Sequence, residues 1–123
     1  MSAGRKTIFL VDDDMTNLTV GKKALSGHYN VMTLGSGTLL LEVLENRAPD
    51  LILLDVNMPE MDGHETLKRV KANKKTAHIP VIFLTAHMDT KGEWAYWGAV
   101  DYILKPFSPE LLLQRVEAHF MKP

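Results

Sequence analysis

Acidic residues follow two short apolar segments of the chain, and their grouping could support metal and phosphate chemistry. Asp12, Asp13 and Asp14 come directly after one apolar segment, and Asp55 comes directly after another. Carboxylates brought close together raise one another's pKa values unless a cation offsets their charge. Because the chain has no cysteine and oxygen ligands suit hard ions, Asp12, Asp13 and Asp55 predict a site for Mg²⁺, with Mn²⁺ as the alternative.

Two further polar residues follow later apolar segments. Thr85 ends the fourth such segment and Lys105 follows the fifth, ahead of Pro106. An ammonium group and a hydroxyl group can bind phosphate oxygens beside a metal ion. Phosphoryl transfer requires mainly positioning and charge neutralisation, and an aspartate can accept the group as an acyl phosphate. These residues therefore predict phosphoryl chemistry with one aspartate as the nucleophile.

The elements that must position these residues can be identified from the hydrophobic pattern. Five short apolar runs, at Thr7–Val11, Val31–Leu34, Leu51–Leu54, Val81–Leu84 and Tyr102–Leu104, predict strands. Their continuous apolarity is typical of parallel strands that are buried on both faces. Amphipathic helices are expected between them and at the end. Leu39, Leu40, Val43 and Leu44 form one helical face after a capping Ser36, and Ser108 and Pro109 begin the last helix.

Alternating strands and helices indicate one α/β domain with a doubly wound sheet. In such sheets ligands bind beyond the carboxyl ends of the strands, where the polar residues lie.

The 123 residues, 46% apolar and 24% charged, suit a single globular domain. A net charge of -1 disfavours nucleic-acid binding. The apolar run after Lys6 is too short for a signal peptide or a membrane span, so a cytoplasmic protein is expected.

Four sequence elements, in order, resemble the receiver domains of two-component response regulators. They are Leu10-Val11-Asp12-Asp13, the stretch from Asp50 through Asp55, Asn57 and Pro59 to Asp62-Gly63, then Leu84-Thr85-Ala86, and Gly98 through Tyr102 and Lys105-Pro106 to Phe107. The resemblance implies a flavodoxin-like (βα)5 fold with five parallel strands in the order 2-1-3-4-5. It also implies that residues 1–123 form one receiver domain, with a core over about residues 6–120.

The resemblance implies a role for each matching residue. Asp55 would accept a phosphoryl group, and Asp13, Asp55 and the backbone carbonyl of Asn57 would hold Mg²⁺, with Asp12 acting through a metal-bound water. Phosphoryl binding and switching fall to Thr85, Ala86, Lys105 and Tyr102. Asn57 and His87, two residues beyond Asp55 and Thr85, occupy positions that tune the lifetime of the phosphoryl group. The Lys105–Pro106 peptide bond is expected to be cis.

The resemblance also implies partners. A sensor histidine kinase or a phosphotransfer protein would supply the phosphoryl group, and a downstream effector or fused output domain would read it. The face made by the fourth helix, fifth strand and fifth helix would change on phosphorylation and could form a homodimer. The domain would promote its own phosphorylation and slow dephosphorylation without being an enzyme in the usual sense.

Three other functions share features with this sequence. Phe9-Leu-Val-Asp12-x-Asp14-x-Thr16 is similar to the first motif of haloacid-dehalogenase-type phosphohydrolases, with Asp12 as nucleophile. Those enzymes need a late acidic pair, and none follows Lys105 in a suitable place. A flavodoxin needs a hydroxyl-rich and glycine-rich phosphate loop, which three aspartates replace here. A pseudo-receiver that only binds a partner is the third alternative.

The segment between Thr85 and Lys105 departs from the family pattern, because it is about two residues shorter than usual. It carries Trp94 and Trp97, three residues apart on one helical face. These tryptophans could pack into the core or could form an exposed patch for a partner. Asp14, which follows Asp12 and Asp13, is expected to cap a helix. The five histidines are expected to be ordinary surface or packing residues.

Overall fold

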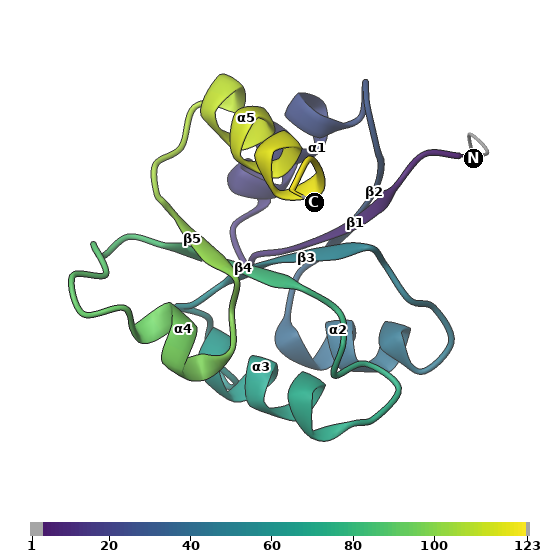
Figure 1. Ribbon diagram of the computed structural model, residues 1–123, viewed down its shortest axis with the longest axis vertical. Helices are drawn as coiled ribbons and strands as arrows, with labels where there is room; N and C mark the ends of the chain where they lie inside the picture. The colour runs from purple at the N-terminus through teal and green to yellow at the C-terminus, as the bar shows by residue number, and fades with distance from the viewer. Residues whose placement is uncertain (1–3, 123) are drawn as a thin grey trace.

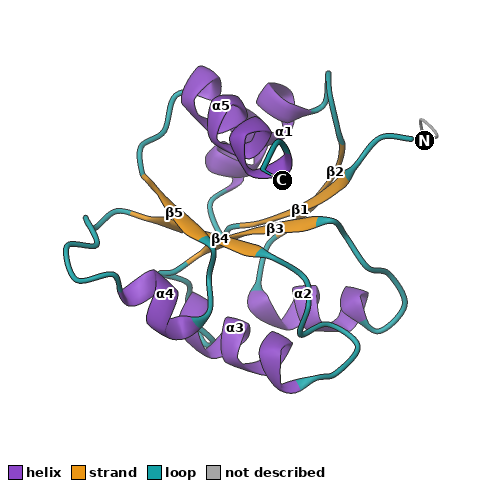
Figure 2. Cartoon of the chain, viewed as in Figure 1, coloured by secondary structure: helices purple, strands orange, loops and turns teal. Residues whose placement is uncertain are grey.

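Five strands alternate with five helices in the computed structural model, which describes residues 4–122. The strands are β1 (Thr7–Val11), β2 (Asn30–Leu34), β3 (Leu51–Asp55), β4 (Val81–Thr85) and β5 (Asp101–Leu104). The helices are α1 (Met15–Leu25), α2 (Gly37–Leu44), α3 (Gly63–Ala72), α4 (Glu93–Trp97) and α5 (Pro109–Phe120). Figure 2 shows how regularly the two kinds of element alternate along the chain.

All five strands are parallel and lie in the order β2-β1-β3-β4-β5. The flavodoxin-like fold class and the strand order expected from the sequence are therefore confirmed. α1 and α5 cover one face of the sheet, and α2, α3 and α4 cover the other (Figure 1). Because β3 lies in the middle of the sheet, its carboxyl end has a neighbouring strand on each side.

Each face of the sheet has its own hydrophobic core. Phe9, Val11, Ile52 and Leu54 point toward the layer of α2, α3 and α4. Ile8, Leu10, Leu51 and Leu53 point toward the layer of α1 and α5. Strands with apolar residues on both faces must be covered by helices on both sides, which explains the continuous apolar runs of the sequence.

The expected burial of all strands on both faces is wrong for the two edge strands. Every residue of β3 and β4 is buried, whereas β2 and β5 have one buried residue each, Leu34 and Ile103. An edge strand has a neighbour on one side only, so solvent reaches its residues. Within α2, Leu40 and Leu44 are buried as expected, but Leu39 is 40% exposed.

Side-chain caps begin four of the helices. The Asp14 carboxylate accepts the backbone N–H of Thr16 at 2.8 Å, which confirms the expected cap of α1. The Ser36 and Ser108 hydroxyls cap α2 and α5 as expected, and Asp62 caps α3. A cap satisfies a backbone donor that has no partner within the helix. Each helix within residues 4–122 is too short or too polar to span a lipid bilayer.

α4 has only five residues and is flanked by two glycines with positive φ, Gly92 at 71° and Gly98 at 100°. Trp94 and Trp97 are half-buried and pack against the core on this side of the sheet. The structure therefore favours the packing interpretation of the two tryptophans. The large exposed aromatic residue of α4 is Tyr96, which is 83% exposed.

Gly63 allows α3 to begin directly against the end of β3. A Cβ atom at Gly63 would lie 2.4 Å from the carbonyl oxygen of Asp55 and 2.7 Å from Cα of Val56. Both neighbours are backbone atoms, so they cannot move aside without displacing the end of β3.

We therefore expect Gly63→Ala to lower the free energy of unfolding by about 1–3 kcal/mol through overpacking. Urea denaturation measures this change. Gly35→Ala is the matched control, because a Cβ atom there meets nothing within 4 Å. Equal stability of the two variants would contradict the close approach of α3 to β3.

Candidate functional site

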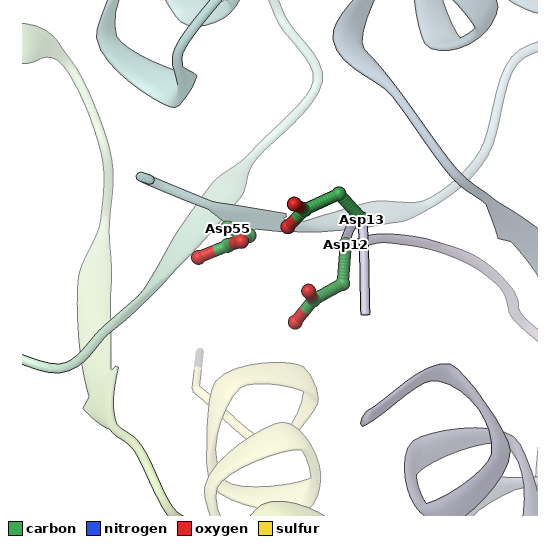
Figure 3. Close-up of side chains that lie close together, drawn as sticks. All are labelled: Asp12, Asp13 and Asp55. Atoms are coloured by element: carbon green, nitrogen blue, oxygen red, sulfur yellow. The ribbon is translucent and has the colours of Figure 1, made fainter. Parts of the chain in front are cut away.

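The charged residues singled out in the sequence meet at the carboxyl edge of the sheet. Asp12 and Asp13 follow β1, Asp55 ends the neighbouring β3, and Lys105 follows β5. One oxygen of each of the three carboxylates lies within 4.8 Å of the others. Figure 3 shows the three side chains leaving the ends of the two strands with their carboxyl groups gathered around one space. The parallel order of the strands brings these distant residues together.

Two of the three carboxylates are removed from solvent. Asp12 is 0% exposed and Asp55 is 1% exposed, whereas Asp13 is exposed. Isolated buried carboxylates are costly, so they need a charged partner or several hydrogen bonds. Among the described residues this group is the one in which three potential metal-ligating side chains come together.

Lys105 provides that charged partner. Its Nζ donates to Asp12 Oδ2 at 3.1 Å and to Asp55 Oδ1 at 2.9 Å. Burial alone would lower the pKa of Lys105, but the hydrogen bonds and charges of Asp55 and Asp12 raise it above its ordinary value. Lys105 therefore stays charged, and one ammonium group faces three carboxyl groups.

The pKa of Asp55 rises from 3.8 to about 6, because burial disfavours the charged form. The Lys105 hydrogen bond lowers this pKa, and the charge of Asp12 raises it again. The raised value means that the ion pair with Lys105 only partly offsets the cost of burying the charge. An additional cation would favour the ionised carboxylate.

The hydrogen bonds of the site leave one buried oxygen without a partner. Asp12 Oδ1 accepts the backbone N–H of Asp14 at 3.0 Å, and Asp55 Oδ1 accepts that of Asn57 at 3.3 Å in addition to Lys105. Asp55 Oδ2 is buried and has no hydrogen-bond partner among the described residues. An unpartnered oxygen beside two further carboxylates suits a hard cation such as Mg²⁺.

The other predicted residues lie beside this cluster. A cavity of about 310 Å³ is lined by residues that include Asn57, Thr85, His87 and Tyr102. Thr85 is buried, and its Oγ1 accepts the backbone N–H of His87 at 3.1 Å. Ala86 is exposed directly after Thr85, at the same edge of the sheet. The Lys105–Pro106 peptide bond is cis, the isomer that the resemblance implied.

Tyr102 is half-buried on β5 and packs against the core on the side of α3 and α4. Arg115 of α5 donates to the Tyr102 carbonyl oxygen at 2.8 Å and pairs with Asp101. These contacts tie the edge strand β5 to α5.

Sequence reasoning missed two residues beside the site. His64 lines the same cavity as Thr85, and its ring stacks on Trp97 with the centroids 4.6 Å apart. Asp89 accepts the backbone N–H groups of Glu93 and Trp94 at the start of α4. His64 directly follows the Asp62-Gly63 turn, and this position was the one sequence feature that could have pointed to it. Its stacking partner, Trp97, lies 33 residues away along the chain, so no local pattern predicts the contact.

Comparison with known proteins identifies the family. The model of the response regulator receiver domain matches residues 8–117, so the chain belongs to that family. A probable cyclic di-GMP phosphodiesterase of Vibrio cholerae is 43% identical over 92% of this chain and 26% of that protein. The transcriptional regulatory protein ZraR of Escherichia coli is 41% identical over 91% of this chain and 26% of that protein. The chain spans about a quarter of the length of these relatives.

Solved structures support the same assignment. The chemotaxis protein CheY4 of Vibrio cholerae superposes with a TM-score of 0.87 at 30% identity, covering 94% of this chain and 98% of that chain. The N-terminal domain of a response regulator receiver protein from Methanoculleus marisnigri has a TM-score of 0.78 at 40% identity, covering 96% and 98%. Residues 8–117 thus form a receiver domain of the two-component response-regulator family, which is a signalling domain.

The raised pKa of Asp55 predicts a pH-dependent effect of removing its charge. Between about pH 4 and pH 6 the folded protein holds a proton on Asp55 that the unfolded chain has lost, so this group lowers stability as the pH rises. Asp55→Asn lacks this group, so its free energy of unfolding minus that of the parent should increase from pH 4 to pH 6, by on the order of 2 kcal/mol. Urea denaturation of both proteins at a series of pH values, without divalent cations, measures the difference.

Asp50→Asn is the control for this prediction, because the Asp50 carboxylate is exposed and accepts the backbone N–H of Thr7. A constant stability difference between Asp55→Asn and the parent from pH 4 to pH 7 would show that burial does not raise the pKa of Asp55.

Proposed function

We propose that this receiver domain is a phospho-accepting switch in which Asp55 takes a phosphoryl group from a histidine kinase or a phosphotransfer protein. The observation that carries the proposal is the Lys105 ammonium held between the buried Asp12 and Asp55 carboxylates, at 3.1 Å and 2.9 Å. It places one positive charge where a phosphoryl group on Asp55 would need it. Asp55 has two carboxylate oxygens, and Oδ2 has no hydrogen-bond partner among the described residues. One oxygen could therefore hold a cation while the other attacks phosphorus.

The proposed step is an in-line displacement at phosphorus. A carboxylate oxygen of Asp55 forms a bond to phosphorus while the P–N bond of the donor phosphohistidine breaks. The bonding electron pair stays on the imidazole nitrogen, which is protonated as it leaves. Lys105 then neutralises charge on the phosphoryl oxygens, and the Thr85 hydroxyl donates a hydrogen bond to one of them.

Mg²⁺ fits the donor set, because the cluster has three carboxylates and one ammonium, and one buried oxygen has no partner in the described part of the chain. Asp13, Asp55 and the backbone carbonyl of Asn57 would hold the ion, with Asp12 acting through a bound water; Mn²⁺ is the alternative. When bound, the ion supplies charge neutralisation for the phosphoryl oxygens. We propose in addition that Asn57 and His87, which line the adjoining cavity, tune how long the phosphoryl group persists.

The proposed output begins at Thr85 and Tyr102, which share that cavity. Movement of Thr85 toward the phosphoryl group would let Tyr102 turn inward, and the face of α4, β5 and α5 would change for a partner or for homodimer contacts. We propose in addition that residues 1–123 form one receiver domain, that the protein is cytoplasmic and that it does not bind nucleic acid directly. A downstream effector or a fused output domain would read the change.

A phosphohydrolase with Asp12 as the nucleophile is less consistent with the site. Both oxygens of Asp12 are engaged, one with Lys105 and the other with the backbone N–H of Asp14. Among residues 4–122 the grouped metal-ligating side chains include no acidic pair beyond Lys105. Asp55, in contrast, has one oxygen that no described residue engages, so its carboxylate is the better nucleophile on these grounds.

Phosphorylation by a small-molecule donor tests the proposal. The parent protein with Mg²⁺ and acetyl phosphate should gain one phosphoryl group, seen by intact-mass spectrometry, and chelation of Mg²⁺ should abolish the gain. Asp55→Asn should gain none, since an amide cannot form the acyl phosphate. Borohydride reduction of the phosphorylated parent should convert Asp55 to homoserine, which peptide mass spectrometry locates.

Asp50→Asn is the matched control and should be phosphorylated like the parent. Homoserine at position 12, or phosphorylation that survives Asp55→Asn, would favour the phosphohydrolase alternative. Absence of phosphorylation in the parent would instead favour a pseudo-receiver that only binds a partner.

A further inference from the structure

The position of α4 depends on a few side-chain contacts. The helix spans only Glu93–Trp97 and contains no buried residue. Its start is held by the Asp89 carboxylate, which accepts the backbone N–H groups of Glu93 at 2.8 Å and Trp94 at 2.7 Å. Helices this short are not stable alone. Its orientation therefore rests largely on the packing of Trp94 and Trp97 against the rest of the molecule.

Trp97 packs on an aromatic partner from a different helix. The His64 ring stacks on the Trp97 ring at 4.6 Å between centroids with an angle of 18° between planes. The same histidine meets the Phe83 ring of β4 edge-on, at 5.4 Å and 89°. His64 therefore lies between α4 and the sheet and contacts an aromatic ring of each.

The backbone connects His64 directly to the phospho-acceptor strand. Gly63 donates its N–H to the Val56 carbonyl at 2.8 Å, and its Cα lies so close to Asp55 that a Cβ would be 2.4 Å from the Asp55 carbonyl oxygen. α3 cannot shift at its first turn without moving the residues that follow Asp55. His64 also lines the cavity that Asn57 and Thr85 line.

We propose that His64 is a positioning residue that couples the state of the Asp55 site to the orientation of α4 through its stack on Trp97. The coupling runs from Asp55 through Gly63 and His64 to Trp97. It differs from the route through Thr85 and Tyr102 because it begins at the backbone contact between Gly63 and the end of β3. This proposal rests on the proposed function, because the change of state at Asp55 is its phosphorylation. The element that responds is the short α4, whose few contacts allow it to move.

Trp97 itself can report the coupling. The chain has two tryptophans, so in a Trp94→Phe background all indole emission comes from Trp97. Emission is recorded before and after phosphorylation with Mg²⁺ and acetyl phosphate, and intact-mass spectrometry measures the phosphorylated fraction of the same samples. His64→Ala removes the stacked ring, His64→Phe keeps an aromatic ring, and His78→Ala replaces an exposed histidine as the matched control.

We expect phosphorylation to change Trp97 emission in the parent background, in His64→Phe and in His78→Ala. His64→Ala should lose most of that change while reaching the same phosphorylated fraction. Should His64→Ala fail to fold, His64→Leu, which preserves apolar volume but not the ring plane, should show the same loss.

A full emission change in His64→Ala or His64→Leu would overturn the proposal, and so would an equal loss in His64→Phe. Phosphorylation of the parent background without any change in Trp97 emission would overturn the coupling alone. Absence of phosphorylation in the parent would overturn the proposed function and this coupling with it.

Discussion

Lys105 lies with its ammonium group between two carboxylates that solvent does not reach, and the rest of the site is arranged around this ion pair. Asp12 and Asp55 could not both be buried at the sheet edge without a positive charge in contact with them. One lysine does not balance three carboxyl groups, and the raised pKa of Asp55 reflects the remaining cost of burying its charge. The three carboxyl groups and one ammonium group therefore leave an excess of negative charge at this edge of the sheet.

The parallel sheet makes this ion pair possible across a considerable distance. Asp55 ends β3 and Lys105 follows β5, with β4 between them. Strands two places apart are separated by about 10 Å, so only a long side chain can reach from one to the other. Thr85 at the end of the intervening β4 then lies beside the path of that side chain. The cavity next to Thr85 leaves room for movement on the side of α4.

Most of the fold could be predicted from local sequence patterns, because each pattern has a local physical cause. Buried parallel strands need continuous apolar runs, and Asp14, Ser36 and Ser108 satisfy backbone donors within their own helices. The apolar pattern places Leu39 on the same helical face as Leu40, but the sheet covers only part of that face, so Leu40 is buried and Leu39 is 40% exposed. The burial of β2 and β5 was predicted wrongly, because an apolar run does not show whether its strand has a neighbour on both sides.

The sequence by itself indicated which polar groups reach the sheet edge, because their positions directly after apolar runs place them at the carboxyl ends of the strands. The family resemblance extended this to the strand order and to individual roles. The way these groups meet depends on the tertiary structure: Lys105 contacts Asp12 and Asp55 together, and one Asp55 oxygen has no hydrogen-bond partner within residues 4–122. It also decided that His64 stacks on Trp97. Such contacts join residues far apart in the chain, and their geometry depends on the packing of whole elements rather than on any local pattern.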